Sequence, residues 1–425
     1  MPFTMMKHYF LLLCLFLSAC SSVPKAQPNP TPTARPAALP TRPAFERDES
    51  SRALSIMHVG GTVLSVDIAV HPTLGWPAVV AVEASLTSRD TPHVLVRAYN
   101  PITRRWGSTQ SLGSQGTALF SRFRTAQIAI SADNTIHVVW GPGRIAKLGL
   151  YASESHDYGE TWSEPRIIAQ ASYGVFDIAT SLDGALFVLA NSEAHQQPLF
   201  IRRSTDGQWQ PPELLPMPSW YGSTGALSVT GEGAYPNILL LSTGGGGSSA
   251  DNAVFSAYHQ GQSGPWNVER HLVSADTIDL LTHVRATPLS EATLFTFAMD
   301  AHADVYALRM HNGQRQAITR VVQNSGKQTP YATAAFDPFT QRSIVLWTCC
   351  ADARFVAAES THYARWNTSD NDVWLPDNAT PLLTGAISAA DLASAQAHNS
   401  RQVWLVWAES VHDVMVRSLD LDLIK

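Results

Sequence analysis

The stretch Ser155-His156-Asp157-Tyr158-Gly159-Glu160-Thr161-Trp162 decides the fold of this chain. Its pattern, Ser-x-Asp-x-Gly-x-Thr-Trp, predicts a self-contained hairpin turn in which Thr161 completes the motif. We expect the side chains of Ser155 and Asp157 to hydrogen-bond to the backbone of the turn. Gly159 should supply a positive φ, and Trp162 should pack underneath. Turns of this kind recur once per unit in repeat proteins, so the motif favours a repeat architecture over any particular chemistry.

Units of about 50 residues repeat along the chain, which is the period typical of a β-propeller. Each unit opens with a short apolar strand, a turn and a second apolar strand, as in residues 127–130 and 136–140. The first strand recurs around Ile68, Ile128, Ile178, Leu227, Val284, Ala334 and Leu392. Three of these strands share Asp-Ile/Leu-Ala, beginning at Asp67, Asp177 and Asp391. The motif of residues 155–162 is incomplete in other units, but its tryptophan is still present, as Trp106, Trp209, Trp266 and Trp374.

Alternating apolar residues, frequent turn dipeptides and the absence of long helical periodicity predict an all-β chain. We predict a β-propeller of four-stranded antiparallel blades. Seven units favour seven blades, and six blades with an irregular first unit is the alternative. The last unit runs out of chain after residues 414–419, so residues 53–59 are expected to supply its outer strand and close the ring.

The first 51 residues are predicted to be an export signal and a tether. Leu17-Ser18-Ala19-Cys20 follows an apolar run and resembles a bacterial lipobox, which implies cleavage before Cys20 and a lipid on its sulfur. An ordinary signal peptide is the alternative. Residues 20–51 are rich in proline and read as an extended tether. The expected organisation is signal peptide 1–19, lipidated tether 20–51 and propeller 52–425, on a membrane-anchored extracytoplasmic lipoprotein.

Composition excludes some partners. A net charge of −6 and a pI near 6.2 show none of the excess positive charge that is typical of nucleic-acid-binding proteins. No motif predicts a cofactor, and a monomer is expected. The adjacent Cys349 and Cys350 form either a vicinal disulfide or two independent thiols, because neighbours on a strand point to opposite faces.

Strand direction predicts the ligand-binding face. In an antiparallel four-stranded blade the first and third turns share one face, and the motif of residues 155–162 is a third turn. The second turns and the connections between blades therefore lie on the opposite face, where we expect the ligand. Acidic, basic and aromatic side chains of that face suit a polar ligand such as a glycan. The candidates are Arg144, Glu193, His195, Asp300, His302, Tyr331, Asp352, Arg354, Glu409 and His412. No metal site is predicted.

The motif and its echoes resemble the Asp-box (BNR) repeats of the sialidase-like propeller superfamily, over roughly residues 55–425. Sialidases of that superfamily bind the substrate carboxylate with three arginines and use a Tyr–Glu nucleophile pair with an Asp acid/base. Their Arg-Ile-Pro motif has no counterpart here, and Arg144-Ile145-Ala146 is the nearest echo. No catalytic residue is therefore assigned. We expect a membrane-anchored propeller that binds a glycan or a protein. An exo-sialidase or other glycoside hydrolase, and a non-catalytic scaffold of a membrane-associated assembly, are the alternatives.

Overall fold

A computed structural model gives the structure of the chain. It describes residues 53–84, 93–114, 126–141, 149–170, 172–192, 197–216, 221–230, 235–243, 253–259, 265–271, 284–289, 292–299, 304–311, 314–322, 332–337, 342–349, 360–368, 375–385, 387–394, 402–409 and 412–420. All of them belong to the compact unit Arg42–Lys425. The predicted signal peptide, Cys20 and the tether lie outside these ranges. Within them, no helix is long and apolar enough to span a membrane.

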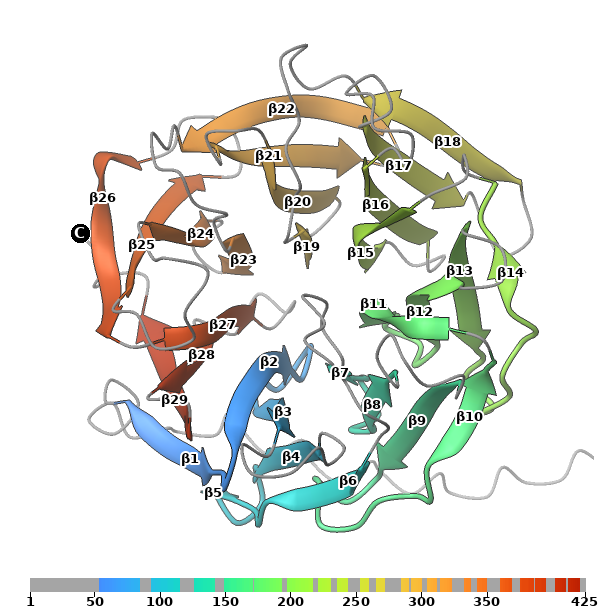
Figure 1. Ribbon diagram of the computed structural model, residues 1–425, viewed down its shortest axis with the longest axis vertical. Coiled ribbons are helices and arrows are strands. Elements are labelled where there is room, and N and C mark those ends of the chain that lie inside the picture. The colour runs from blue at the N-terminus through green and yellow to red at the C-terminus, as the bar shows by residue number, and fades with distance from the viewer. Residues whose placement is uncertain are drawn as a thin grey trace, which may run out of the picture. The chain divides into compact units, whose positions relative to one another are not determined.

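The described residues form 29 strands and no helix, and the strands make seven antiparallel sheets. Figure 1 shows the sheets side by side around a central axis, with one strand of each sheet innermost. The innermost strands contact one another in a closed circle, in the order β2, β7, β11, β15, β19, β23, β27 and back to β2. The predicted all-β propeller is confirmed. The sheets are numbered I to VII along the chain.

Sheets I to III contain the motif and its first echoes. Sheet I comprises β2 (Thr62–Val70), β3 (Pro77–Ala84), β4 (His93–Asn100), β5 (Arg105–Trp106) and β6 (Gln110–Ser114). Sheet II comprises β7 (Ala126–Ile130), β8 (Ile136–Trp140), β9 (Leu150–Ser155) and β10 (Arg166–Ala169). Sheet III comprises β11 (Ser172–Thr180), β12 (Leu186–Ser192), β13 (Gln197–Arg203) and β14 (Glu213–Leu214).

Sheets IV to VII complete the circle. Sheet IV comprises β15 (Tyr221–Thr230), β16 (Tyr235–Thr243), β17 (Ala253–His259) and β18 (Trp266–His271). Sheet V comprises β19 (Val284–Pro288), β20 (Ala292–Met299), β21 (Asp304–His311) and β22 (Gln314–Val322). Sheet VI comprises β23 (Ala332–Asp337), β24 (Arg342–Cys349), β25 (Ser360–Thr368) and β26 (Leu375–Gly385). Sheet VII comprises β27 (Ile387–Ser394), β28 (Gln402–Glu409), β29 (Asp413–Asp420) and β1 (Leu54–His58).

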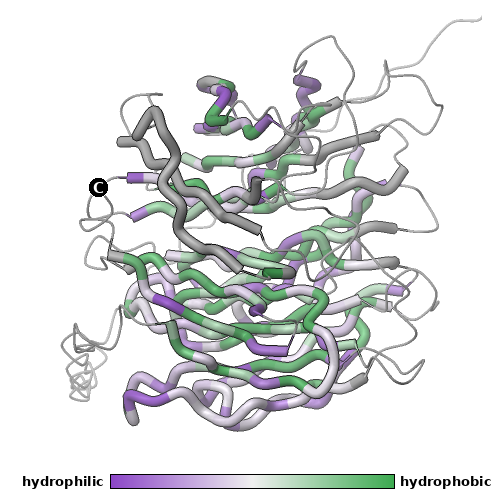
Figure 2. The backbone as a smooth tube through the Cα atoms, turned by 60° about the vertical axis from the view of Figure 1, so that its left-hand side comes forward, coloured by the Kyte–Doolittle hydropathy of each residue, from purple (hydrophilic) through white to green (hydrophobic). Residues whose placement is uncertain are grey.

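The hydrophobic core lies between neighbouring sheets. The second strand of a sheet is covered on both faces, so β8 is buried at all five positions. Apolar residues from two sheets then share one cluster, as Val80 and Val96 of sheet I do with Ile128 and Val138 of sheet II. Figure 2 shows how hydrophobic residues follow the strands. Each sheet therefore depends on its neighbours, as repeat architectures require.

The ring closes as predicted, because β1 from the start of the propeller pairs antiparallel with β29. Ile56 of β1 is buried in a cluster that joins sheets VII and I. Arg97 of sheet I donates from Nε to the Gly107 carbonyl at 2.6 Å and from Nη1 to the Ile56 carbonyl. The backbone N–H of Val59 donates to the His412 carbonyl at 2.9 Å. The outer edge of β29 is thus paired within the chain.

Candidate ligand-binding site

The turn at residues 155–162, which we call the box-like turn, has the hydrogen bonds expected from its sequence. Ser155 Oγ accepts from the Gly159 N–H at 2.9 Å and donates to Asp157 Oδ1 at 2.8 Å. Asp157 also accepts from the backbone N–H and the hydroxyl of Thr161, at 2.9 and 2.5 Å. Trp162 Nε1 donates to the Gly159 carbonyl at 3.2 Å, and its ring packs on the core between sheets I and II.

The box-like turn defines one face of the propeller, here called the box face. Thr135 follows the first turn of sheet II, and its hydroxyl bonds to Nδ1 of His156 in the third turn at 3.0 Å. First and third turns therefore share a face, as strand direction predicts. The echo at residues 204–209 uses the same chemistry, because Ser204 donates to Asp206 and Gly207 has a φ of 88°.

Most of the predicted ligand-binding residues lie outside the described residues. This holds for Arg144, Glu193, His195, Asp300, His302, Tyr331, Asp352 and Arg354. It also holds for Cys350, so the vicinal disulfide with Cys349 stays a prediction. The opposite face as a whole likewise stays a prediction. In the described ranges no group of three or more His, Cys, Asp or Glu side chains is arranged to hold a metal ion.

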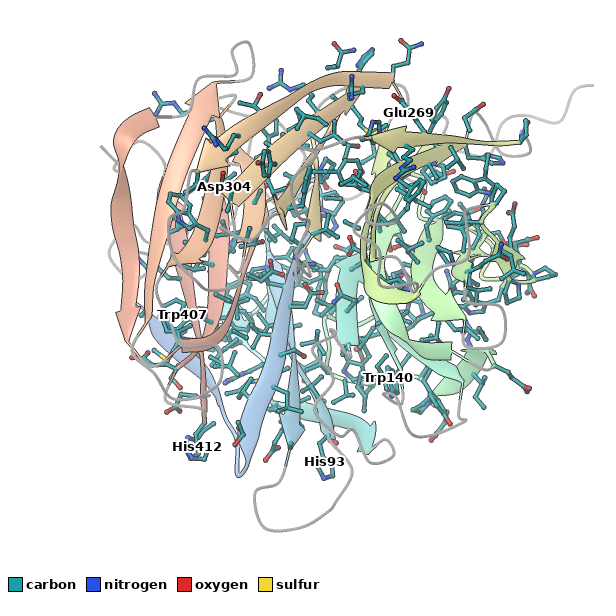
Figure 3. All side chains as sticks on the ribbon, turned by 45° about the horizontal axis from the view of Figure 1, so that its top comes forward. His93, Trp140, Glu269, Asp304, Trp407 and His412 are labelled. Carbon is teal, nitrogen blue, oxygen red and sulfur yellow. The ribbon has the colours of Figure 1, made fainter. Side chains whose placement is uncertain are left out.

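Glu409 and His412 are the two described members of the predicted set, and they flank the second turn of sheet VII. His412 Nδ1 bonds to the Gly61 carbonyl at 2.7 Å, and its own carbonyl accepts from Val59. Figure 3 shows His412 and His93 along one edge of the molecule, where β29 and β4 begin. The contacts of His412 hold the start of β2 against sheet VII, so they serve ring closure.

The Asp-Ile/Leu-Ala triplets line the central axis. Asp67 Oδ2 accepts from the Ile128 N–H at 2.8 Å, and Asp177 Oδ2 accepts from the Leu227 N–H at 2.9 Å. Asp391 accepts from the Thr333 hydroxyl at 2.6 Å. Each aspartate therefore ties its own innermost strand to that of a neighbouring sheet.

Arg285 of β19 completes this axial cluster, and sequence analysis did not identify it. Its guanidinium donates to Asp67 Oδ1 at 2.6 Å and to both carboxylate oxygens of Asp391, one of them from Nε at 3.1 Å. Nη1 lies 3.4 Å from Gln127 Oε1 and 3.9 Å from Asp177 Oδ1. The cluster is buried, and the guanidinium of Arg285 forms ion pairs with carboxylates of the chain itself. Arg285 is therefore not available to clamp the carboxylate of a substrate.

A cavity of about 150 Å³ lies beside the axial cluster. In sheet I its lining runs from Asp67 to Pro72, toward the first turn, so it lies on the box-face side of the cluster. Small and apolar residues such as Ala129, Ala179 and Ala335 dominate the walls. This volume is below the range of about 300–1,000 Å³ that small-molecule sites usually occupy.

A larger hollow of about 460 Å³ lies between sheets III and IV, and we call it the III/IV groove. Its walls are aromatic, charged and polar side chains of both sheets: Phe187, Phe200, Arg202, Ser204, Gln210, Pro211, Glu213, Pro236, His259 and Trp266. Ser204 and Gln210 flank the third turn of sheet III, while His259 and Trp266 flank that of sheet IV. The groove therefore lies on the box face, opposite to the predicted ligand face.

Trp266 organises the III/IV groove. Its ring meets Phe200 edge-on at a centroid distance of 5.0 Å and lies 5.0 Å from the His259 ring. Its Nε1 donates to Glu213 Oε1 at 2.8 Å across the gap between the sheets. Trp266 is only partly buried, so its indole combines an apolar surface with a fixed polar end. Sequence analysis found Trp266 as an echo of the motif, but not Glu213 or Arg202.

The equivalent tryptophans of sheets II and III, Trp162 and Trp209, pack against core clusters between the sheets. Trp162 packs on the core between sheets I and II. Trp209 has the Arg166 guanidinium 5.5 Å from its ring centroid. Arg166 and Arg203 both pair with Glu154, at 2.9 and 2.7 Å, and these ion pairs join sheets II and III beside Trp209. Trp209 thus provides a matched, closed counterpart of Trp266.

Buried histidines near the box face are held neutral. Burial, together with the nearby Arg203 charge, lowers the pKa of His137 to about 3. Burial also lowers the pKa of His71 to about 4, and its Nδ1 accepts from the Leu74 N–H at 3.0 Å. Both rings serve as neutral elements of the fold at physiological pH.

The architecture defines a β-propeller built from four-stranded antiparallel sheets. No family model matches the chain, and no curated protein sequence matches it. Similar solved structures include the Hadza microbial sialidase Hz136, at 12% identity and a TM-score of 0.47 over 87% of this chain and 68% of that chain. A mutant of AofleA from Arthrobotrys oligospora aligns at 12% identity and a TM-score of 0.48, over 79% of this chain and 90% of that chain.

The polysaccharide lyase Uly1 aligns at 12% identity and a TM-score of 0.51, over 82% of this chain and 88% of that chain. The likeness to Uly1 shows a shared fold. One architecture carries many chemistries, so a shared fold does not identify an activity.

Proposed function

We propose that this protein is an extracytoplasmic, lipid-anchored propeller that binds a carbohydrate in the III/IV groove. The observation that carries the proposal is the combination of Trp266 and Phe200 with Arg202, Glu213 and His259 in one hollow of about 460 Å³. Sugar rings present C–H groups on one side and hydroxyls around the edge. An aromatic wall beside charged hydrogen-bonding groups complements both features.

The III/IV groove lies on the box face, whereas strand direction led us to expect the ligand on the opposite face. Eight of the ten residues predicted on the opposite face lie outside the described residues, while the III/IV groove is built from described residues. A glycan is the favoured ligand because the groove offers a concave, mixed surface, whereas a protein partner would be expected to need a broader interface of roughly 800 Å².

A glycan array probed with the full chain in detergent tests this proposal. We expect carbohydrate binding by the wild-type chain, loss of it in Trp266→Ala and retention of it in Trp209→Ala, whose indole lies in a closed position. Binding that survives Trp266→Ala would move the site elsewhere, including the opposite face. No binding to any glycan would reject the function. Turnover of a fluorogenic sialoside would favour the hydrolase alternative.

The membrane anchor rests on the sequence Leu17-Ser18-Ala19-Cys20. A lipid on Cys20 would hold the propeller at a membrane surface, with the proline-rich segment as a spacer. We expect Cys20→Ser to release the protein from the membrane fraction of the cells that express it. Unchanged retention of Cys20→Ser in that fraction would show that the anchor is not this lipid.

A further inference from the structure

We infer that the III/IV groove selects an acidic saccharide, a pyranose whose carboxylate meets the Arg202 guanidinium while its ring packs beside Trp266. This inference rests on the proposed function and specifies the class of ligand. It follows from the way in which the arginines near this face are paired.

Arg202 differs from the other arginines close to it. Arg166 and Arg203 both pair with Glu154, and Arg285 pairs with Asp67 and Asp391. Within the described part of the chain, Arg202 has no ion pair with a carboxylate. Its buried Nε has no hydrogen-bond partner, but the same is true of the Nε of Arg203, so the missing ion pair is what distinguishes Arg202. Its guanidinium instead lies 5.5 Å from the ring centroid of Phe187. An arginine without a carboxylate, in the wall of a hollow, is a ready partner for an external oxyanion.

The acidic residue of the groove does not neutralise Arg202. Glu213 is exposed, and one of its oxygens accepts from Trp266 Nε1 at 2.8 Å. This bond holds the carboxylate at the indole end of the groove. The lining therefore separates a positive group at Phe187 from a negative group at Trp266. A uronic or sialic acid fits this polarity, with its carboxylate toward Arg202 and its hydroxyls toward Glu213 and Gln210.

The aromatic side chains supply a binding surface that does not depend on charge. Trp266 and Phe200 present ring surface and edges that pack against the C–H groups of any pyranose. A neutral sugar is therefore expected to bind weakly through this wall, and the carboxylate adds affinity through Arg202. A charge-assisted hydrogen bond to a guanidinium accounts for about a tenfold gain or more.

Titration calorimetry of the full chain in detergent tests the inference. The probes form two pairs, each of an acid and its neutral match. The first pair is an oligogalacturonide and its methyl ester, which has the same rings without the charge. The second pair is sialyllactose and lactose. Comparison of the two acidic probes shows whether the groove binds the carboxylate of a uronic acid or that of a sialic acid. We expect at least one acid to bind about ten times more tightly than its neutral match, and its affinity to fall as salt is raised.

Two variants assign the effect to Arg202. Arg202→Gln should reduce the preference for the acid to within about twofold, and an unchanged midpoint of thermal denaturation shows that the variant is folded. Trp266→Ala should abolish binding of both members of a pair, and Trp209→Ala should change neither. A preference that persists in Arg202→Gln would overturn the assignment of this residue. Neutral probes that bind as tightly as their acids would overturn the acidic class and leave the proposed function standing. Absence of binding by every probe and every glycan would reject both.

Discussion

Gly159 allows the box-like turn to approach the neighbouring sheet closely. Its φ is 85°, a region that residues with a side chain rarely adopt, and a Cβ placed there would lie 2.9 Å from the Ala98 Cβ of sheet I. Gly159→Ala therefore adds backbone strain and a steric clash at an interface between sheets. We expect it to lower the free energy of unfolding by about 2–4 kcal/mol, measured by urea denaturation.

Gly184 is the matched control for Gly159. Its φ of 92° is similar, but nothing lies within 4 Å of the position that a Cβ would take. Gly184→Ala should retain the backbone strain alone and cost about 1 kcal/mol. Equal losses for the two variants would show that the contact with Ala98 adds nothing.

His137 makes stability depend on pH. Its pKa in the folded chain is about 3, against an ordinary value of 6.5, so the unfolded chain binds the proton more readily. The stabilising contribution is complete above pH 6.5 and is lost as the pH falls toward 3. Each pH unit below 6.5 removes up to about 1.4 kcal/mol, or roughly 2 kcal/mol by pH 5.

Urea denaturation at pH 7 and pH 5 measures this contribution. We expect His137→Asn to show a smaller difference between the two pH values than the wild-type chain. His156→Asn changes a histidine that is largely exposed and should alter the difference less than His137→Asn does. A His137→Asn variant with the full wild-type difference would assign the pH dependence to other groups, such as His71.

At the scale of elements, β1 completes sheet VII by covering the edge of β29. Ile56 of β1 is 1% exposed and packs between sheets VII and I, while Leu54 of the same strand is 50% exposed. We expect Ile56→Ala to lower the free energy of unfolding by about 2–4 kcal/mol because it opens a cavity at the ring closure. Leu54→Ala should change it by less than about 0.5 kcal/mol. Comparable losses in thermal denaturation would contradict a specific role for the buried face of β1.

The elements themselves were largely predictable. Regular alternation and turn signals located the first two strands of sheet II closely, as residues 127–130 lie within β7 and residues 136–140 coincide with β8. The pairing of residues 53–59 with the last sheet followed from counting strands. Strand ends were less accurate: β7 begins at Ala126, one residue before the predicted residues 127–130, because Ala126 pairs with Trp140.

At the scale of the whole molecule, Arg285 connects sheets on opposite sides of the axis. Removing one partner from a buried ion pair leaves charge uncompensated in a poorly hydrated place, which typically costs 3–5 kcal/mol. We expect Arg285→Leu to destabilise the propeller by about that amount in thermal denaturation. The side chain of Arg320, which pairs with Asp304 at 3.2 Å, is 49% exposed. Arg320→Leu should cost at most about 1 kcal/mol, because solvent screens such pairs. Equal effects would indicate that the axial cluster adds no more than a surface pair.

The residues 155–162 by themselves determined the box-like turn, because the hydrogen bonds of Ser155 and Asp157 within it join atoms no more than four residues apart. Repetition of this signal and of the apolar strands also determined the propeller, since each unit needs a neighbour to cover its apolar faces. Only the tertiary structure decided the sites. Arg285 and Asp67 meet across 218 positions of sequence, and Trp266 and Glu213 across 53. Such contacts depend on how the sheets pack around the axis, and no local pattern encodes which side chains that packing leaves without a partner.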